Sequence, residues 1–372
     1  MPWSKGLSLF TLASEDTVDE PCAALFKRME RAVSTVPTML KRMNSAAIAA
    51  SLTVAAMCPA QQPGTSPSPV VTQWFAFHNN QWVNLHHFLY VTARAREGLD
   101  ATRASVVRAL ADTAGFGQLS VEQKAAWANA LDYYTKFVAK RDILFDSSLV
   151  DVNNRLAALE RASTVGGTPG LDTGIASALD RAAPAYRALW WPRHDAANRR
   201  WIAAIVPMVR DHGAAAVHAE ERIFRHDWSA TPVRVDVSAY TNWAGAYTTE
   251  DPGHINVSSD SSDLGKPATF ETMFHEVLHT MDDSVFRVLQ TSFKAQKKRW
   301  FRDPTHPFIF YTAGELTRRE FPGYVPFAES AGLWARNSDF VKILPMLREY
   351  WQPYLDGKSS LEEAMRQIAE HW

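Results

Sequence analysis

The chain has 372 residues, of which 46% are hydrophobic and 21% are charged. This balance is typical of a globular protein with a substantial core and one or two domains. The formal net charge is −1, so we expect no nucleic-acid partner and no electrostatic attraction to an anionic membrane. The 13 tryptophans are many, and we expect most of them to pack in a helical core.

The first 60 residues have the features of a targeting segment. Lys41 and Arg42 precede the apolar run 45–57, and small residues allow cleavage after Ala60. This layout predicts a bacterial-type signal peptide at 39–60, hence a secreted or periplasmic protein, with residues 1–38 as an N-terminal extension. The apolar run is too short to span a bilayer, so we expect no stable membrane span. The alternative is a cytosolic protein with a mildly apolar N-terminus.

The two cysteines, Cys22 and Cys58, both precede the predicted cleavage site. The mature chain would then contain no cysteine, so we expect neither disulfide bonds nor thiol chemistry. Any metal ion would have to be bound by histidine and carboxylate side chains.

A linker rich in proline and serine at 61–69 precedes an almost wholly helical domain at 70–228. Ser120 and Gln123 form a predicted capping box at the start of a long helix. The histidines of the first segment are His78, His86 and His87. Adjacent histidines point in different directions on a helix, and no carboxylate has ligand spacing nearby, so we expect buried hydrogen-bonding roles for them.

The pattern changes after residue 229, where short strands are predicted at 233–237, 245–248 and 254–258. Further helices are predicted at about 308–321, 325–336, 340–350 and 360–371. We therefore expect a second domain at 229–372 with a small sheet, and a fold class of α+β that is predominantly α-helical.

The most specific motif of the chain is the H-E-x-x-H pentapeptide at 275–279. Apolar residues recur around it at helical spacing, which predicts a buried helix. Residues i and i+4 lie on the same face of a helix, so His275 and His279 can bind one Zn²⁺ side by side. Glu276 can then act as the general base toward a metal-bound water. The structural alternative is a core helix with two hydrogen-bonded histidines.

A zinc site of this kind needs a third protein ligand. The metzincin continuation of the motif is absent, because Asp282 and Val285 stand where that pattern requires glycine and histidine. The remaining arrangement resembles the gluzincins, the zinc metallopeptidases that include thermolysin, neprilysin and certain aminopeptidases. The resemblance covers about residues 233–336. It implies a zincin-like catalytic part, in which a glutamate from a later helix completes the metal site.

Glu315 and Glu329 are the two candidates for that glutamate, and we favour Glu315. Small residues at 313 and 314 precede Glu315, so its helix can approach the active-site helix closely. Tyr311 lies one turn earlier on the same face and is predicted to donate a hydrogen bond to an oxyanion, with His306 as the alternative donor. Arg318, one turn later, can brace the carboxylate.

Three further carboxylates lie close to the motif in sequence. Asp282 and Asp283 follow His279 by three and four residues, and Glu271 precedes His275 by one helical turn. Any of the three can accept the free N–H of a histidine that binds metal. The alternative role for each is a charged residue at a helix end.

These features together predict a secreted or periplasmic zinc metallopeptidase that acts on a peptide or protein substrate. The expected site residues are the Zn²⁺ ligands His275, His279 and Glu315 and the catalytic residues Glu276 and Tyr311. Residues 242–248 are the expected edge strand that holds an extended substrate. One alternative is a non-catalytic envelope protein with a structural or degenerate zinc site and a helical partner-binding domain. Another is metal-dependent hydrolysis of a different bond, such as an envelope amide.

Overall fold

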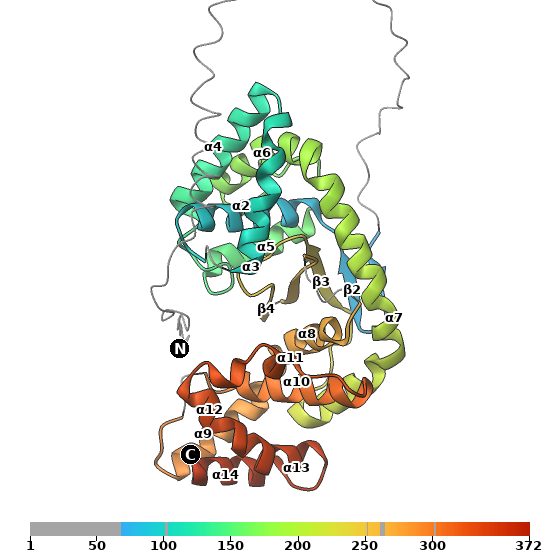
Figure 1. Cartoon of the computed structure of the whole chain (residues 1–372), viewed down its shortest axis with the longest axis vertical. Helices are drawn as coiled ribbons and strands as arrows, with labels where there is room; N and C mark the ends of the chain where they lie inside the picture. The colour runs from blue at the N-terminus through green and yellow to red at the C-terminus, as the bar shows by residue number, and fades with distance from the viewer. Residues whose placement is uncertain (1–67, 101–102, 251, 261–264, 301–302) are drawn as a thin grey trace, which may run out of the picture. The chain divides into compact units, whose positions relative to one another are not determined.

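The computed structural model describes residues 68–100, 103–250, 252–260, 265–300 and 303–372. The described chain is mostly helical and contains one mixed five-stranded sheet, which agrees with the predicted α+β class (Figure 1). The predicted N-terminal extension, the signal peptide and both cysteines lie outside the described residues. Within these ranges, no helix is both long enough and apolar enough to cross a membrane.

The described chain divides into two compact units. The first unit contains residues 89–191, and the second contains Ser68–Phe88 together with Pro192–Trp372. One division falls within α2 (Gln81–Arg96), and the other falls after the first residue of α7 (Trp191–Phe224). This division differs from the predicted boundary at residue 228, because the segment 70–78 pairs with strands of the second unit.

The first unit is helical. Its described elements are α3 (Ala104–Asp112), η2 (Thr113–Gln118), α4 (Val121–Phe137), α5 (Ser147–Ala158) and α6 (Thr173–Leu189). The capping box before α4 is confirmed: Ser120 Oγ accepts from the Gln123 N–H, and the Gln123 side chain accepts from the Ser120 N–H. Trp127 and Trp190 are fully buried, with ring centroids 4.3 Å apart, so these two tryptophans are core residues as expected.

The sheet of the second unit has the strand order β1-β2-β3-β5-β4. Its strands are β1 (Val70–Val71), β2 (Phe75–His78), β3 (Val233–Ser238), β4 (Ala246–Glu250) and β5 (Gly253–Ser258). Strands β2, β3 and β5 are parallel neighbours, and the outer strands β1 and β4 are antiparallel to theirs. The three strands predicted after residue 229 are confirmed, whereas β1 and β2 are an addition to the prediction.

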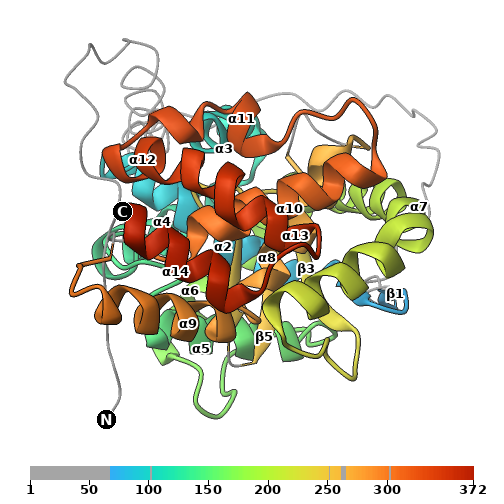
Figure 2. The same cartoon turned by 90° about the horizontal axis from the view of Figure 1, so that it is seen from below.

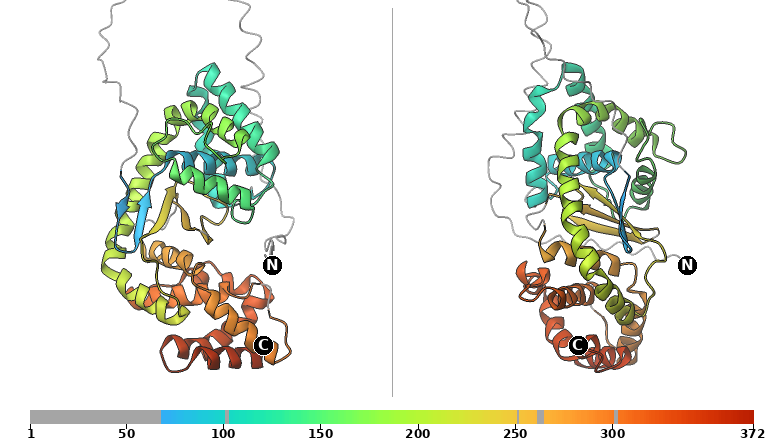
Figure 3. Two further views of the ribbon diagram at one scale, coloured as in Figure 1. Left: turned by 180° about the vertical axis from the view of Figure 1, so that it is seen from behind. Right: turned by 90° about the vertical axis from the view of Figure 1, so that its right-hand side faces the viewer.

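Successive side chains of a strand point to opposite faces of a sheet. Hydrophobic residues occupy every second position of these strands, so one face of the sheet is apolar. Phe75, Val235 and Ile255 are fully buried members of the hydrophobic core on this face. Helix α8 (Pro267–Leu278) packs against the same face, where the rings of Phe75 and Phe274 meet edge to face at 5.6 Å. Figure 3 shows α7 running alongside the first two strands of the sheet.

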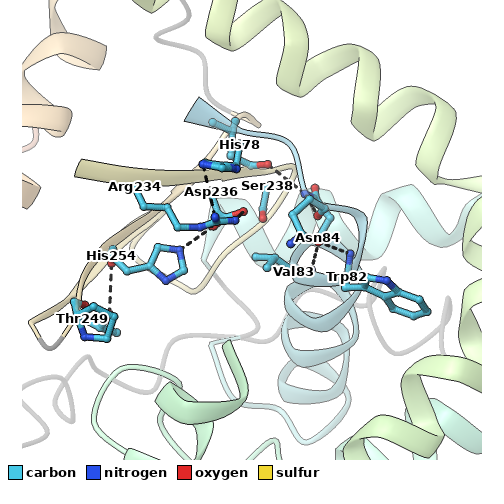
Figure 4. Close-up of polar contacts among 12 residues, drawn as sticks. His78, Trp82, Val83, Asn84, Arg234, Asp236, Ser238, Thr249 and His254 are labelled. Atoms are coloured by element: carbon cyan, nitrogen blue, oxygen red, sulfur yellow. Dashed lines mark hydrogen bonds and ion pairs between the residues drawn. The ribbon is translucent and has the colours of Figure 1, made fainter. Parts of the chain in front are cut away.

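The opposite face of the sheet is polar but also largely buried. Figure 4 shows Asp236 between Arg234 and His254, and the His254 Nε2 lies 2.8 Å from a carboxylate oxygen of Asp236. His87, on the first turns of α2, contacts the carbonyl of Val83 through Nδ1 and the hydroxyl of Tyr247 through Nε2. The expected buried hydrogen-bonding role is thus confirmed for His87.

Helices complete the second unit after α8. They are α9 (Asp283–Ala295), α10 (His306–Glu320), α11 (Phe327–Ser330), η3 (Leu333–Ala335), α12 (Ser338–Met346), η4 (Leu347–Trp351), α13 (Gln352–Leu355) and α14 (Leu361–His371). Figure 2 shows α9 and α14 packed side by side. The helix predicted at 308–321 is confirmed as α10, whereas the segment 325–336 forms only two short turns of helix.

A glutamate on α7 is buried in the core of the second unit. Glu220 is 0% exposed, and neither of its carboxyl oxygens has a hydrogen-bond partner among the described residues. Burial raises the pKa of this carboxyl well above 4.5, since a charged group in a low-dielectric interior is unfavourable. The protonated form of Glu220 is therefore the form that the fold favours.

We expect Glu220→Gln to remove a pH dependence of stability. The pKa of Glu220 is higher in the folded state than in the unfolded state. Its contribution to the free energy of unfolding is therefore retained below about pH 4.5, and it is lost as the pH rises through the pKa of the folded state. In that window the wild-type free energy of unfolding should fall relative to the variant by at most about 1.4 kcal/mol per pH unit. Urea unfolding at several pH values measures this, and a wild-type-to-variant difference that is constant with pH would contradict it.

Candidate metal centre

The H-E-x-x-H motif lies at the C-terminal end of α8. The helix begins at Pro267, a residue suited to the first turn of a helix. Buried apolar side chains of α8 hold it against the core, and the motif histidines occupy the remaining side. The imidazole ring centroids of His275 and His279 are 5.1 Å apart, so the pair lies on one side of the helix end as predicted.

His306 brings a third imidazole to this pair. It is the first residue of α10, and its ring centroid lies 5.6 Å from that of His275 and 4.8 Å from that of His279. One nitrogen from each of the three rings lies within 4.8 Å of the other two. Within the described part of the chain, this is the only group of three or more histidine, cysteine or acidic side chains arranged so closely.

Asp303 determines the orientation of His306. Its Oδ2 lies 2.8 Å from Nδ1 of His306, which can donate to it. A proton on Nδ1 leaves the lone pair on Nε2, the nitrogen that is then available to a metal ion. Burial alone would lower the pKa of His306, but the hydrogen bond and negative charge of Asp303 raise it above its usual value.

The other two histidines are held in their neutral form. Burial keeps the pKa of His275 well below its usual value and lowers the pKa of His279 to about 3. Metal binding requires the neutral imidazole. Nδ1 of His275 is also buried without a hydrogen-bond partner among the described residues, which is costly unless the ring gains another interaction. Three imidazoles, each neutral once it binds a metal ion, form a donor set that suits Zn²⁺.

Glu276 lies beside the histidines and is held by β4. Its side chain is buried, and its Oε2 accepts a hydrogen bond of 2.7 Å from Thr248 Oγ1. Burial raises the pKa of Glu276 to about 7, against the opposing effects of the Thr248 hydroxyl and of His306. A carboxyl group with this pKa can accept and release a proton near neutral pH.

The aromatic ring of Phe310 packs against two of the three histidines. It lies one turn after His306 on α10. Its ring stacks on that of His306, with centroids 5.1 Å apart, and is tilted by 40° to that of His275, with centroids 4.4 Å apart. An apolar neighbour of this kind lowers the local dielectric and strengthens the electrostatic interactions of the site.

Glu315, the predicted third ligand, is not a member of this group. It follows His306 by nine residues on the same helix, which is about 14 Å along the helix axis. Its carboxylate lies 3.5 Å from Arg318, and Arg318 also pairs with Glu329 at 2.8 Å. Both candidate glutamates thus belong to an ion-pair group around Arg318, and His306 stands where the sequence analysis placed a glutamate.

The small residues of α10 do allow the expected close approach to α8. A Cβ atom on Gly314 would lie 2.7 Å from Pro326 and 3.5 Å from a carboxylate oxygen of Glu271. Glu271 lies one turn before His275, on the same side of α8 as the motif histidines. Gly314 thus approaches Pro326 most closely, and it packs against α8 one turn before the motif.

Tyr311, the predicted oxyanion donor, has another partner. Its hydroxyl donates to Gln352 Oε1 at 2.9 Å, and its ring lies beside Trp334. Burial raises its pKa to about 12. The alternative donor, His306, is instead one of the three grouped histidines.

Two of the three carboxylates proposed to support the ligand histidines, Glu271 and Asp282, have other hydrogen-bond partners. Glu271 accepts from the hydroxyl of Tyr324 at 2.6 Å and from the N–H of Phe327 at 3.0 Å. Asp282 accepts from Thr305, and burial raises its pKa to about 6. The supporting carboxylate that the structure provides is Asp303. The sequence analysis missed it, although its place three residues before a histidine at a helix start is a usable signal.

Comparison with protein-family models, with characterised proteins and with solved structures gave no match. The function must therefore be inferred from the arrangement of the residues themselves.

We expect His306→Ala to weaken zinc binding strongly and Glu315→Ala to leave it unchanged. Loss of Asp303, which only orients His306, should weaken binding by about 10- to 100-fold, and loss of His306 itself should weaken it further. Competition with a chromophoric chelator measures the zinc affinity of each of the three variants. An equal loss in Glu315→Ala and His306→Ala would contradict the assignment.

Proposed function

We propose that this protein is a zinc-dependent metallopeptidase. His275, His279 and His306 would hold the metal ion, and Glu276 would act as general base. The observation that carries the proposal is the grouping of three imidazole nitrogens within 4.8 Å, next to a buried carboxyl group with a pKa of about 7. The third ligand differs from the glutamate that the gluzincin resemblance implies.

The chemistry divides between the metal and the chain. A zinc ion with three protein ligands keeps an open position, and when bound it supplies Lewis-acid chemistry and makes water more acidic. The Glu276 carboxylate accepts a proton from the water that attacks the scissile carbonyl. It then returns that proton to the leaving nitrogen, which its pKa near neutrality favours.

The edge strand β4 supports a peptide as the substrate. The N–H of Ser258 on β5 donates to the carbonyl of Gly245 at 2.7 Å. The direction of main-chain hydrogen bonding alternates along an antiparallel strand. The N–H and C=O groups of Ala246 and Thr248 therefore point away from β5, toward the outer edge of the sheet. An extended peptide can pair with such an edge, and on β4 it would pass directly beside Glu276.

This edge strand is close to the predicted one. The prediction placed it at 242–248, whereas the strand itself is Ala246–Glu250. The side chain of Asn242 instead accepts from the N–H groups of Ala244 and Gly245, which forms the turn before β4.

The competing function is that of a non-catalytic protein with a structural zinc site. Structural zinc sites normally have four protein ligands, and three grouped ligands are present among the described residues. A buried glutamate beside them also has no role in a purely structural site. These two observations favour catalysis. A secreted or periplasmic location belongs to the proposal, and hydrolysis of a non-peptide amide would use the same residues.

We expect Glu276→Gln to lower the rate of peptide hydrolysis by at least about 100-fold, because glutamine cannot take the proton. The probe is a pooled library of internally quenched fluorescent peptides with the zinc-loaded full chain. Zinc content and melting temperature should stay unchanged. Glu315→Gln, the same substitution outside the histidine group, is the matched control and should remain active. Equal activity of wild type and Glu276→Gln would refute the proposal.

A further inference from the structure

Thr248 connects β4 to the candidate general base. The residue is 5% exposed, and its Oγ1 lies 2.7 Å from Glu276 Oε2 and 2.9 Å from the Glu276 carbonyl oxygen. One hydroxyl carries one proton, which it can donate to either acceptor. Donation to a carboxylate is the stronger of the two, since hydrogen bonds to ionised groups are about twice as strong as neutral ones.

The position of the Glu276 carboxylate depends on this contact. Among the described residues, Thr248 is the only side chain that hydrogen-bonds to it. A glutamate side chain has several rotatable bonds, so without a fixed partner its carboxylate occupies several positions. A catalytic group must be held to within about 0.5 Å of its productive position to act efficiently.

The main chain of the same residue lies on the outer edge of the sheet. The alternation along β4 directs the N–H and C=O of Thr248 away from β5, where a substrate strand would pair. The side chain of Thr248 contacts Glu276 at the same time. One residue therefore lies between the expected substrate backbone and the expected base.

We propose that Thr248 is a positioning residue, which fixes the carboxylate of Glu276 and aligns it with a peptide bound along β4. This inference rests on the proposed peptidase function, because it assigns a role to Thr248 only if Glu276 is the base. The hydroxyl of Thr248 acts through Glu276 and takes no part in bond making or breaking.

The chain offers a matched control in the next residue. Thr249 is equally buried, at 4% exposed, and its side chain lies on the opposite face of β4. Its Oγ1 donates to the carbonyl of Pro252 at 3.2 Å, and the alternation directs its main chain toward β5. Thr249→Val thus removes a buried hydroxyl from the same strand without touching Glu276.

The test compares Thr248→Val, Thr248→Ser and Thr249→Val in the zinc-loaded full chain, with the most rapidly cleaved peptide of the quenched library. Thr248→Val should lower kcat by about 10- to 100-fold, the loss expected for one hydrogen bond to a charged group. KM should change little. Thr248→Ser should restore most of kcat because it keeps the hydroxyl, and Thr249→Val should leave kcat unchanged. Zinc content and melting temperature exclude a folding defect.

Two results would overturn the role of Thr248: kcat retained in Thr248→Val, or kcat lost equally in Thr248→Val and Thr248→Ser. If wild type and Glu276→Gln hydrolyse the peptide equally, the proposed function fails instead. A crystal structure of Thr248→Val tests the inference without any substrate. It should show the Glu276 carboxylate displaced from its wild-type position, and an unmoved carboxylate would refute the positioning role.

Discussion

The burial of α8 against the apolar face of the sheet is the interaction on which the candidate site depends. The ring centroid of Phe274 lies 5.6 Å from that of Phe75 in the sheet and 4.4 Å from that of Phe270 in its own helix. This packing fixes the apolar side of α8 against the sheet, and the polar motif residues of the helix are buried with it. The same burial lowers the pKa values of His275 and His279 and raises that of Glu276. Packing and chemistry thus have one physical origin.

A histidine as the proposed third zinc ligand would have an electrostatic consequence. Three neutral imidazoles would leave the charge of a divalent ion uncompensated by its ligands, whereas a glutamate ligand would cancel one unit. In this protein the negative charge lies one step further away, on Asp303, and acts through the imidazole of His306. Carboxylates placed in this way orient a ligand histidine and increase its basicity.

Local patterns in the sequence predicted what local interactions determine. The spacing of apolar residues around the motif predicted α8, period-two alternation predicted β3, and the capping box at Ser120 predicted the start of α4. Strand β2 pairs with β3 across more than 150 residues, so no local pattern reveals it. A two-residue strand such as β1 carries too little pattern of its own.

The third member of the site could not be predicted for the same reason. Glu315 and His306 lie on one helix, and both follow the motif at distances that the sequence leaves unconstrained. Which of them meets His275 depends on where α10 begins and on how it packs against α8. The helix begins at His306, so its first residue reaches the histidines, and Glu315 lies more than two turns further along.

Anomalous X-ray diffraction at the zinc absorption edge, on crystals of the full chain purified without added chelator, tests the central claim most directly. The account predicts one zinc ion bound by nitrogens of His275, His279 and His306 at about 2.0–2.1 Å. Crystals without a zinc signal at these histidines, or a zinc ion bound by Glu315 in place of His306, would contradict it.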